Sequence, residues 1–327
     1  SRTALIFPNK RANLFFNEYL AGESDQPIWS PAAMSISDLF QKLSVQKSGD
    51  PIRLVCELYK VFKEETQSQE TLDDFYFWGE LLISDFDDVD KNMVDADKLF
   101  SNLQDLKNLM DNYEFLDKEQ EEAIQQFFQN FSIERRTELK EKFISLWDKL
   151  GTIYHHYREN LTELGIAYEG MLYRNVIEQL DTDQLKYDKY IFVGFNVLNK
   201  VENEFFRKLK DAGKALFYWD YDIFYTQQIR KHEAGEFLKR NLGEFPNELP
   251  ESFFDTFKEP KKIRYISAST ENAQARFLPE WIKMITDNHS QIAEEKEKEN
   301  AVVLCNEALL LPVLHSIPQE VKNVNIT

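Results

Sequence analysis

A long stretch of helical periodicity with very little glycine interrupts a pattern of alternating strands and helices, and this interruption limits the folds open to the chain. Between residue 51 and about residue 178, apolar residues recur at helical spacing, as at Leu54, Leu58, Val61 and Phe62. We expect five or six helices in this stretch. On both sides of this stretch, the sequence has the pattern of alternating strands and helices.

The N-terminal part predicts two strand-to-helix steps. Residues Thr3 to Phe7 form a short apolar run. Pro8 ends this run and can occupy the first turn of a helix that continues to about Ala21. A second apolar piece at residues 32–36 leads into another helix, for which Ser37 is the expected N-cap.

The pattern of alternating strands and helices resumes at residue 190. Residues 190–195 read as a buried strand, 199–212 as a helix and 214–219 as a second strand. A strand, a helix and a strand in this order form the unit of a parallel sheet.

After an irregular stretch at residues 245–260, the same unit is expected once more. Residues 263–267 and 301–305 read as strands, with a helix from Glu271 to about Ile285 between them and another from Glu307. The charged run at residues 294–299 reads as a solvated loop or a frayed helix end.

We therefore predict an α/β fold: a parallel-sheet domain with a large all-helical insertion, followed by part of a second α/β domain. Residues 1–50 and 185–245 are expected to form the first α/β domain, 51–184 the helical insertion, and 261–327 the start of the second.

Charge divides the chain in the same way. The net charge is −18, and it is 0 over residues 1–50, −14 over 51–170 and −4 over 171–327. This balance argues against a protein that holds nucleic acid by electrostatics alone. No apolar run is long enough for a membrane span and no signal pattern opens the chain, so we expect a cytoplasmic protein without a membrane partner.

Cysteine and histidine give no metal pattern. Cys56 and Cys305 are far apart and are expected to be buried small hydrophobes rather than a disulfide or zinc ligands. His155 and His156 are adjacent, so on a helix they would point about 100° apart and would not share a metal ion.

Three segments carry a resemblance to a known family. They are Leu5 to Asn13 (LIFPNKRAN), Ser35 to Phe40 (SISDLF) and Phe192 to Glu204 (FVGFNVLNKVENE). In these segments, and in the order of its elements, the chain resembles the N-terminal, helicase-like part of AddB/RexB-type helicase-nuclease subunits. These are PD-(D/E)XK nuclease family proteins with a degenerate superfamily 1 helicase region.

The resemblance implies a P-loop-helicase-like fold and a role in DNA repair and recombination at double-strand breaks. It implies DNA as a ligand and an AddA-type helicase-nuclease subunit as a partner. In that family the exonuclease, which uses Mg, and the cysteines of an iron-sulfur cluster lie toward the C-terminus. We therefore expect the chain to be a fragment of a longer hydrolase, with no cofactor of its own.

The residues depart from an active motor at the nucleotide site. A phosphate loop needs a glycine-rich turn followed by Lys and Ser or Thr. The only Gly-Lys pair, Gly213-Lys214, follows a helix and is interpreted as a helix C-cap. The strand that would carry the magnesium carboxylate ends in Val193-Gly194, without an acid.

Other polar residues near this region can be explained by local structure, without a bound nucleotide. Asn199 and Glu202 have capping-box spacing. Asp220 and Asp222 follow a parallel strand, where ligand sites occur, but they also suit a solvent-facing turn. We treat Val193, Gly194, Asp220 and Asp222 as a degenerate nucleotide-site region.

No strand carries nuclease residues. Glu138-Leu-Lys140 and Glu295 to Lys298 contain the letters of a PD-(D/E)XK site, but in charged helical or loop text, so we attribute them to chance. The sequence therefore predicts neither ATPase nor nuclease activity for residues 1–327.

Basic residues outside the acidic block are candidates for contact with DNA phosphates, which carries no sequence information. The candidates are Lys10, Arg11, Arg230, Lys231, Lys261, Lys262, Arg264, Ser267, Thr270 and Arg276. Two alternatives stay open at this point. One is an acidic scaffold that binds a basic protein without DNA, and the other is an ATP-dependent helicase whose phosphate loop lies upstream of Ser1.

The most acidic stretch, residues 73–90, is expected to face away from DNA. Its predicted apolar face consists of Phe75, Phe77, Trp78, Leu81, Leu82 and Phe86. Its aspartates at positions 74, 85, 87 and 88 are expected to stay in water.

Overall fold

The chain divides into two compact units, Ser1–Lys258 and Glu259–Thr327. The computed structural model describes residues 2–23, 26, 29–101, 149–227, 233–251, 254–286, 300–319 and 321–326. The first unit is built on a four-stranded sheet in the order β2-β1-β5-β6, with every neighbouring pair parallel. The strands are β1 (Thr3–Phe7), β2 (Ala32–Ser35), β5 (Lys189–Val193) and β6 (Ala215–Tyr218). The α/β class with a parallel sheet is therefore confirmed.

Two helices connect the neighbouring strands. Helix α1 (Lys10–Gly22) joins β1 to β2, and α10 (Lys200–Asp211) joins β5 to β6. Asn9 accepts a hydrogen bond from the backbone of Ala12, so α1 begins at Lys10 and not at Pro8 as expected. The predicted capping box at Asn199 and Glu202 starts α10. Gly213, at φ +65°, ends it as the predicted C-cap glycine.

Helix α2 (Ile36–Leu43) begins earlier than the sequence predicts. Its N-cap is Ser35 rather than Ser37. The Ser35 hydroxyl accepts from the backbone of Asp38, and the Asp38 carboxylate accepts from Ser35 in return. This reciprocal pair needs an acid three residues after the cap, which Ser37 does not have.

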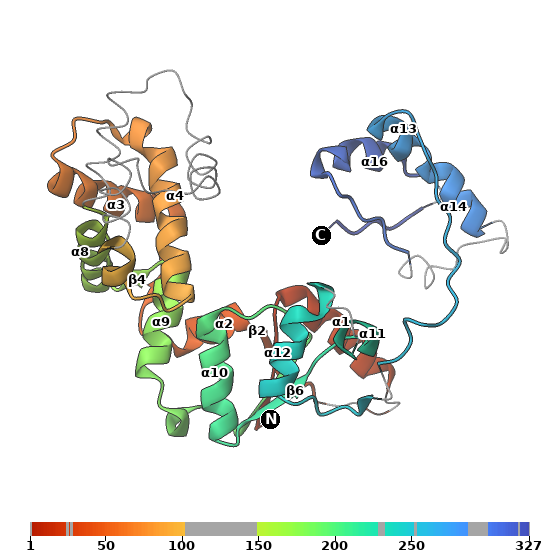
Figure 1. The fold of residues 1–327 in the computed structure, drawn as a ribbon, viewed down its shortest axis with the longest axis horizontal. Helices are drawn as coiled ribbons and strands as arrows, with labels where there is room; N and C mark the ends of the chain where they lie inside the picture. Colours follow the sequence, from red (N-terminus) through yellow and green to blue (C-terminus); the bar gives the residue numbers. More distant parts are fainter. Residues whose placement is uncertain are drawn as a thin grey trace, which may run out of the picture. The chain divides into compact units, whose positions relative to one another are not determined.

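A helical block occupies the interval between α2 and β5. Its main helices are α3 (Pro51–Thr66), α4 (Leu72–Lys91), α8 (Leu150–Glu163) and α9 (Glu169–Gln179). Figure 1 shows α9 running from this block toward the sheet, where it contacts α2 and α10. Part of the predicted series of helices falls on residues 102–148, outside the described residues.

A short parallel ladder, absent from the sequence prediction, joins the start and the end of the block. Strand β3 (Lys47–Ser48) pairs with β4 (Ile166–Ala167). The chain enters the block just after β3 and leaves it through β4 and α9. The two ends of the insertion therefore lie side by side at its base.

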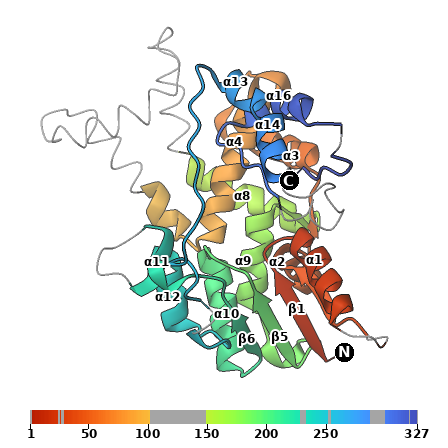
Figure 2. The ribbon, with the colours of Figure 1, turned by 90° about the vertical axis from the view of Figure 1, so that its right-hand side faces the viewer.

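Aromatic residues fix α10 on the sheet, where Figure 2 shows this helix next to β6. Phe192 and Phe217 are partners in the β5–β6 register, and their ring centroids are 5.5 Å apart. Phe206 from α10 packs on Phe192 at 4.0 Å. All three are buried, and each contributes about 1.5–3 kcal/mol of burial free energy.

The chain after β6 closes this aromatic core. The Trp219 indole donates to the carbonyl of Phe245 at 2.8 Å. Helices α11 (Ile223–Gln227) and α12 (Glu236–Glu244) precede Phe245, and short turns of 3-10 helix lie at Thr182–Gln184 and Glu233–Gly235.

The regular elements that the structure describes in the second unit are helices. It contains α13 (Glu271–Arg276), α14 (Leu278–Thr286), a 3-10 turn at Glu307–Leu309 and α16 (Leu310–Ser316). Ala275, Leu278 and Val313 form its small core. The helix expected from Glu271 to Ile285 is interrupted at Phe277.

The predicted strands at 263–267 and 301–305 are wrong for the described residues, which form no ladder there. Tyr265 is 91% exposed and Val303 is 85% exposed. Strand-forming side chains alone do not make a strand, because the backbone also needs a partner for its hydrogen bonds. A second α/β layer is therefore not present in the described part of this unit.

Two smaller expectations have mixed outcomes. Cys56 is half-buried, whereas Cys305 is exposed, so the prediction that both are buried is wrong for Cys305. Among the described helices, none has the combination of length and apolar character needed to cross a bilayer.

Candidate functional site

The sheet has a change of winding direction between β1 and β5. From β1 the chain crosses by α1 to β2, and from β5 it crosses by α10 to β6, on the other side of β1. Right-handed crossovers in opposite directions place their helices on opposite faces of the sheet. In open α/β sheets, ligands bind beyond the carboxyl ends of the strands at such a point. A ligand site is therefore expected at this carboxyl edge.

The residues that follow β1 are already engaged with one another. The Asn9 side chain accepts from the Ala12 amide at 3.0 Å, which occupies one of the free amides of α1. The Lys10 ammonium lies 3.1 Å from the Asp38 carboxylate, and its side chain is 79% exposed. Arg11, the other predicted contact on this turn, is partly exposed. An anion that approaches the Lys10 ammonium group would therefore compete with the Asp38 carboxylate for it.

The end of β5 presents backbone and no carboxylate. Gly194 has φ +74°, and its amide donates to the carbonyl of Tyr218 at 3.0 Å. A Cβ placed on Gly194 would meet no atom within 4 Å. Val193 is half-buried. An active motor places the ligand for magnesium at this point, and neither residue can act as one.

Asp222, four residues beyond the end of β6, organises a loop. Its carboxylate accepts from the backbone amides of Phe224, Thr256 and Phe257 at 2.8, 3.0 and 2.8 Å. Burial acts to raise the pKa of Asp222, but these amide hydrogen bonds outweigh it and hold the pKa below its ordinary value. Asp220 is exposed. The structure therefore favours the loop interpretation of Asp222 over the ligand interpretation.

A cluster of ion pairs lies where the helical block meets α2. Lys91 of α4 lies 2.7 Å from Asp87 and 2.6 Å from Glu169, the first residue of α9. Ser37 and Tyr173 both donate to the other oxygen of Glu169. The Ser37 hydroxyl, which was expected to cap α2, instead joins α2 to α9.

Two carboxyl groups in this region have opposite pKa shifts. Burial acts to raise the pKa of Glu169, but the hydrogen bond and charge of Lys91 lower it overall. Burial dominates at Glu202 and raises its pKa, although the Asn199 amide and Lys91 oppose the change. Sequence reasoning missed this cluster; only the spacing of Asp87 and Lys91, four residues apart on one helix, could have indicated it.

A second cluster surrounds Asp90, whose side chain is fully buried. Its carboxylate accepts from the hydroxyls of Tyr154 and Tyr168 at 2.6 and 2.5 Å. Arg158 forms an ion pair with the same group, and Arg174 lies 3.3 Å from it. One carboxylate therefore holds together the end of α4, the middle of α8, and α9 with its N-cap residue Tyr168.

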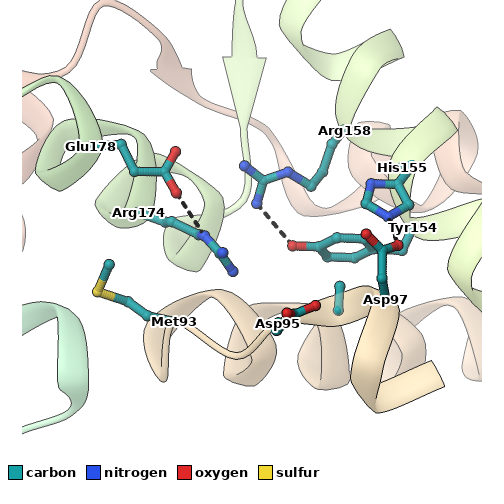
Figure 3. A pocket seen from close by; sticks show the side chains of 9 residues that line it. Met93, Asp95, Asp97, Tyr154, His155, Arg158, Arg174 and Glu178 are labelled. Atoms are coloured by element: carbon teal, nitrogen blue, oxygen red, sulfur yellow. Dashed lines mark hydrogen bonds and ion pairs between the residues drawn. The ribbon is translucent and has the colours of Figure 1, made fainter. Parts of the chain in front are cut away.

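An open hollow of about 380 Å³ lies beside this cluster. Figure 3 shows the guanidinium groups of Arg158 and Arg174 converging in it from α8 and α9. Both are already engaged: Arg158 also binds Asn175 at 3.0 Å, and Arg174 binds Glu178 at 2.9 Å. The lining also includes the carboxylates of Asp95 and Asp97 and the imidazole of His155. Because both arginines are engaged and carboxylates lie beside them, the hollow is not suited to bind a phosphate group.

The predicted DNA contacts fall into separate parts of the chain. Lys10 and Arg11 lie at the carboxyl edge in the first unit. Thr270 caps α13 by accepting from Ala273 at 3.1 Å, and the others of the second unit are also exposed: Lys261, Lys262, Arg264, Ser267 and Arg276. Arg230 and Lys231 lie outside the described residues, as do Glu138, Lys140 and residues 294–299.

The prediction for residues 73–90 is partly wrong. Phe75 and Phe86 are buried, but Phe77 is 65% exposed and Leu81 is 42% exposed. Asp87 is not left in water, because it accepts from the Gly170 amide and pairs with Lys91. The packing of α4 against α3 and α9 decides which of its faces points inward. The acidic sequence of residues 73–90 does not reveal this packing.

Comparisons and metal geometry add no assignment. Among the residues that the structure describes, no three His, Cys, Asp or Glu side chains are placed to share a metal ion. A comparison of the chain with protein-family models and with curated proteins gives no match.

Proposed function

We propose that this chain is a degenerate helicase-like module that guides DNA through its phosphate backbone and does not hydrolyse ATP. The observation that carries the proposal is the carboxyl edge of the sheet at the β1–β5 switch point. There Gly194 stands in place of a carboxylate, and the basic residue Lys10 opens α1. The helical block inserted between β2 and β5, and the resemblance to AddB/RexB-type subunits, support the same assignment.

In this proposal the acidic helical block lies away from the DNA. Its outward carboxylates, such as Asp85 and Asp88, would repel phosphates. The exposed Lys261, Lys262 and Arg264 would attract them without reading sequence. An AddA-type subunit would supply the motor, and magnesium and any iron-sulfur cluster would serve the nuclease of the full-length protein in double-strand break repair.

The test is a salt titration of the affinity for a labelled single-stranded oligonucleotide, followed by fluorescence anisotropy. The double variant Lys261→Glu and Lys262→Glu should bind more weakly than the wild type at low salt and should show a shallower dependence on salt. The variant Asp85→Asn and Asp88→Asn should bind equally well or more tightly, because it loses like-charge repulsion.

The matched control is Lys186→Glu with Lys189→Glu, which makes the same change of charge. Both lysines are exposed, and they lie before and at the start of β5, at the opposite edge of the sheet from Gly194. This control should keep most of the affinity. Equal losses in the two lysine variants, or loss of binding in the aspartate variant alone, would rule out the proposed path.

A further inference from the structure

The last residues of the first unit fold back on the loop that follows β6. Residues 254–257 lie against residues 221–225, and we call residues 254–257 the strap. The first unit ends at Lys258, one residue after the strap. The strap is therefore the point at which the first unit holds the chain before the second unit begins.

One carboxylate holds the strap on the loop. Oδ2 of Asp222 accepts hydrogen bonds from the backbone amides of Thr256 and Phe257 at 3.0 and 2.8 Å. Oδ1 accepts from the amide of Phe224, inside the loop, at 2.8 Å. Hydrogen bonds to an ionised acceptor are roughly twice as strong as those between neutral groups. The Asp222 side chain is therefore the main polar link between the loop and the strap.

Aromatic rings hold the strap at both of its ends. Phe254 is buried and stacks on Tyr221, with ring centroids 4.5 Å apart. Phe257 packs on Phe224 at the same centroid distance. Residues 221–225 follow the carboxyl end of β6. These contacts therefore fix the strap on the side of the sheet where the carboxyl edge lies.

The strap limits how far the basic residues after it can move. Lys261 and Lys262 follow Phe257 by four and five residues, and residues 258–267 are all exposed. An extended chain spans about 3.5 Å per residue, so Lys262 stays within about 18 Å of Phe257 whichever way the second unit is turned. Both lysines are candidate contacts for DNA.

Release of the strap would lengthen this tether. The nearest earlier attachment with side-chain hydrogen bonds is Asn247, which bonds to the backbone of Trp219 through both its amide oxygen and its amide nitrogen. Lys262 would then be tethered by 15 residues instead of five, or by eight if Phe254 stays in place. The effective concentration of a tethered group falls as about the −3/2 power of the tether length, which is about a two- to fivefold decrease here.

We propose that Asp222 is a positioning residue for DNA: through the strap, it keeps Lys261 and Lys262 close to the carboxyl edge of the sheet. The inference rests on the proposed function and adds to it a residue that acts on DNA affinity without contacting DNA. The carboxylate at the end of β6 thus has a role that requires neither a nucleotide nor a metal ion.

The decisive variant is Asp222→Ala, because charge and positioning predict opposite signs for it. Loss of a negative charge alone would tighten DNA binding. Loss of positioning should weaken the affinity for a labelled single-stranded oligonucleotide about two- to fivefold. The slope of the salt dependence should stay unchanged, because no phosphate contact is lost.

The matched control is Glu248→Ala, which makes the same change of charge. Glu248 is exposed, and its backbone amide donates to the carbonyl of Phe217 in β6 at 2.9 Å. This control should bind DNA as the wild type does or more tightly.

A second variant, Phe257→Ala, releases the strap without touching the carboxylate. It removes the ring contact with Phe224 and should weaken DNA binding within the same range. Amide hydrogen exchange without DNA reports on the strap directly. The Thr256 amide should exchange at least about tenfold faster in Asp222→Ala than in the wild type or in Glu248→Ala.

The two proposals fail in different ways. Unchanged exchange of the Thr256 amide, or faster exchange with DNA affinity equal to that of Glu248→Ala, would overturn the positioning role of Asp222 alone. A Lys261 and Lys262 variant that keeps its full affinity would instead show that the DNA path is wrong, and the positioning role would fall with it.

Discussion

Tyr168, the N-cap residue of α9, donates a hydrogen bond of 2.5 Å to the buried carboxylate of Asp90 near the end of α4. The same carboxylate accepts from Tyr154 and forms ion pairs with Arg158 and Arg174. Removing one partner from a buried network leaves charged groups without compensation, whereas the intact network is nearly neutral in its contribution to stability.

This network predicts graded losses of stability. Asp90→Asn should lower the free energy of unfolding by about 3–5 kcal/mol, because it leaves two partly buried guanidinium groups without their shared anion. Tyr168→Phe, which removes one hydrogen bond to a charged acceptor, should cost about 1.5–3 kcal/mol. Urea unfolding followed by circular dichroism measures both. A loss for Asp90→Asn no larger than that for Tyr168→Phe would contradict this account of the network.

A backbone contact between α4 and α9 predicts a second loss. A Cβ placed on Gly170 would lie 2.4 Å from the carbonyl oxygen of Asp87, and backbone cannot rotate away as a side chain can. Gly170→Ala should therefore destabilise the chain by about 1–3 kcal/mol.

Gly243→Ala is the matched control for Gly170→Ala. Gly243 also lies in a helix, and a Cβ there would meet nothing within 4 Å. The control should be neutral or should stabilise the chain by up to about 1 kcal/mol. Similar effects of the two substitutions would mean that α4 and α9 can separate at little cost.

Glu202 predicts a pH-dependent gain of stability on substitution. Burial raises its pKa in the folded chain. The folded state therefore holds this proton more tightly than the unfolded state does, and ionisation of Glu202 destabilises the fold above the folded pKa. That cost disappears as the pH falls through the folded pKa toward the unfolded value.

Glu202→Gln should therefore stabilise the chain at neutral pH and should have little effect at a pH near 4. Glutamine can still complete the capping box with Asn199. The control is Glu163→Gln, an exposed residue at the end of α8. Unfolding by urea over a pH series is the measurement, and a gain that is largest in acid would contradict the raised pKa of Glu202.

The carboxyl edge predicts that Mg-ATP does not stabilise the chain. Neither Val193 nor Gly194 offers a ligand for magnesium, and the carboxylate of Asp222 is occupied by three backbone amides. A ligand at about 100 times its dissociation constant would stabilise the fold by about 2.7 kcal/mol. Thermal melts with and without Mg-ATP should coincide. A clear rise in melting temperature would contradict the assignment.

The sheet and its crossover helices could be predicted because their signals are local. The apolar run before Pro8, the capping box at Asn199 and the glycine at position 213 each mark the limit of an element within a few residues. The segments around Tyr265 and Val303 carry the same kind of local signal. In those two segments the local signal was misleading, because a β-ladder also requires a second strand, which the local sequence does not specify.

The cluster around Asp90 could not be predicted. Asp90 is the last aspartate of an acidic run, and nothing in its neighbours distinguishes it from the exposed Asp88. Its partners Arg158 and Arg174 come from helices on the far side of residues 102–148. Only the packing of α4 against α8 and α9 brings these residues together, and that packing depends on contacts between distant parts of the sequence.

The strand order also sets a schedule for synthesis of the chain. Strand β1 is made first, but its neighbour β5 does not exist until the ribosome has added more than 180 further residues. At usual rates of translation this interval is about 10–40 s. During that time β1 can pair only with β2, and its other edge is open to whatever extended chain is nearby. A nascent-chain chaperone that shields Thr3–Phe7 until β5 emerges would therefore raise the yield of folded protein more than one that acts after release.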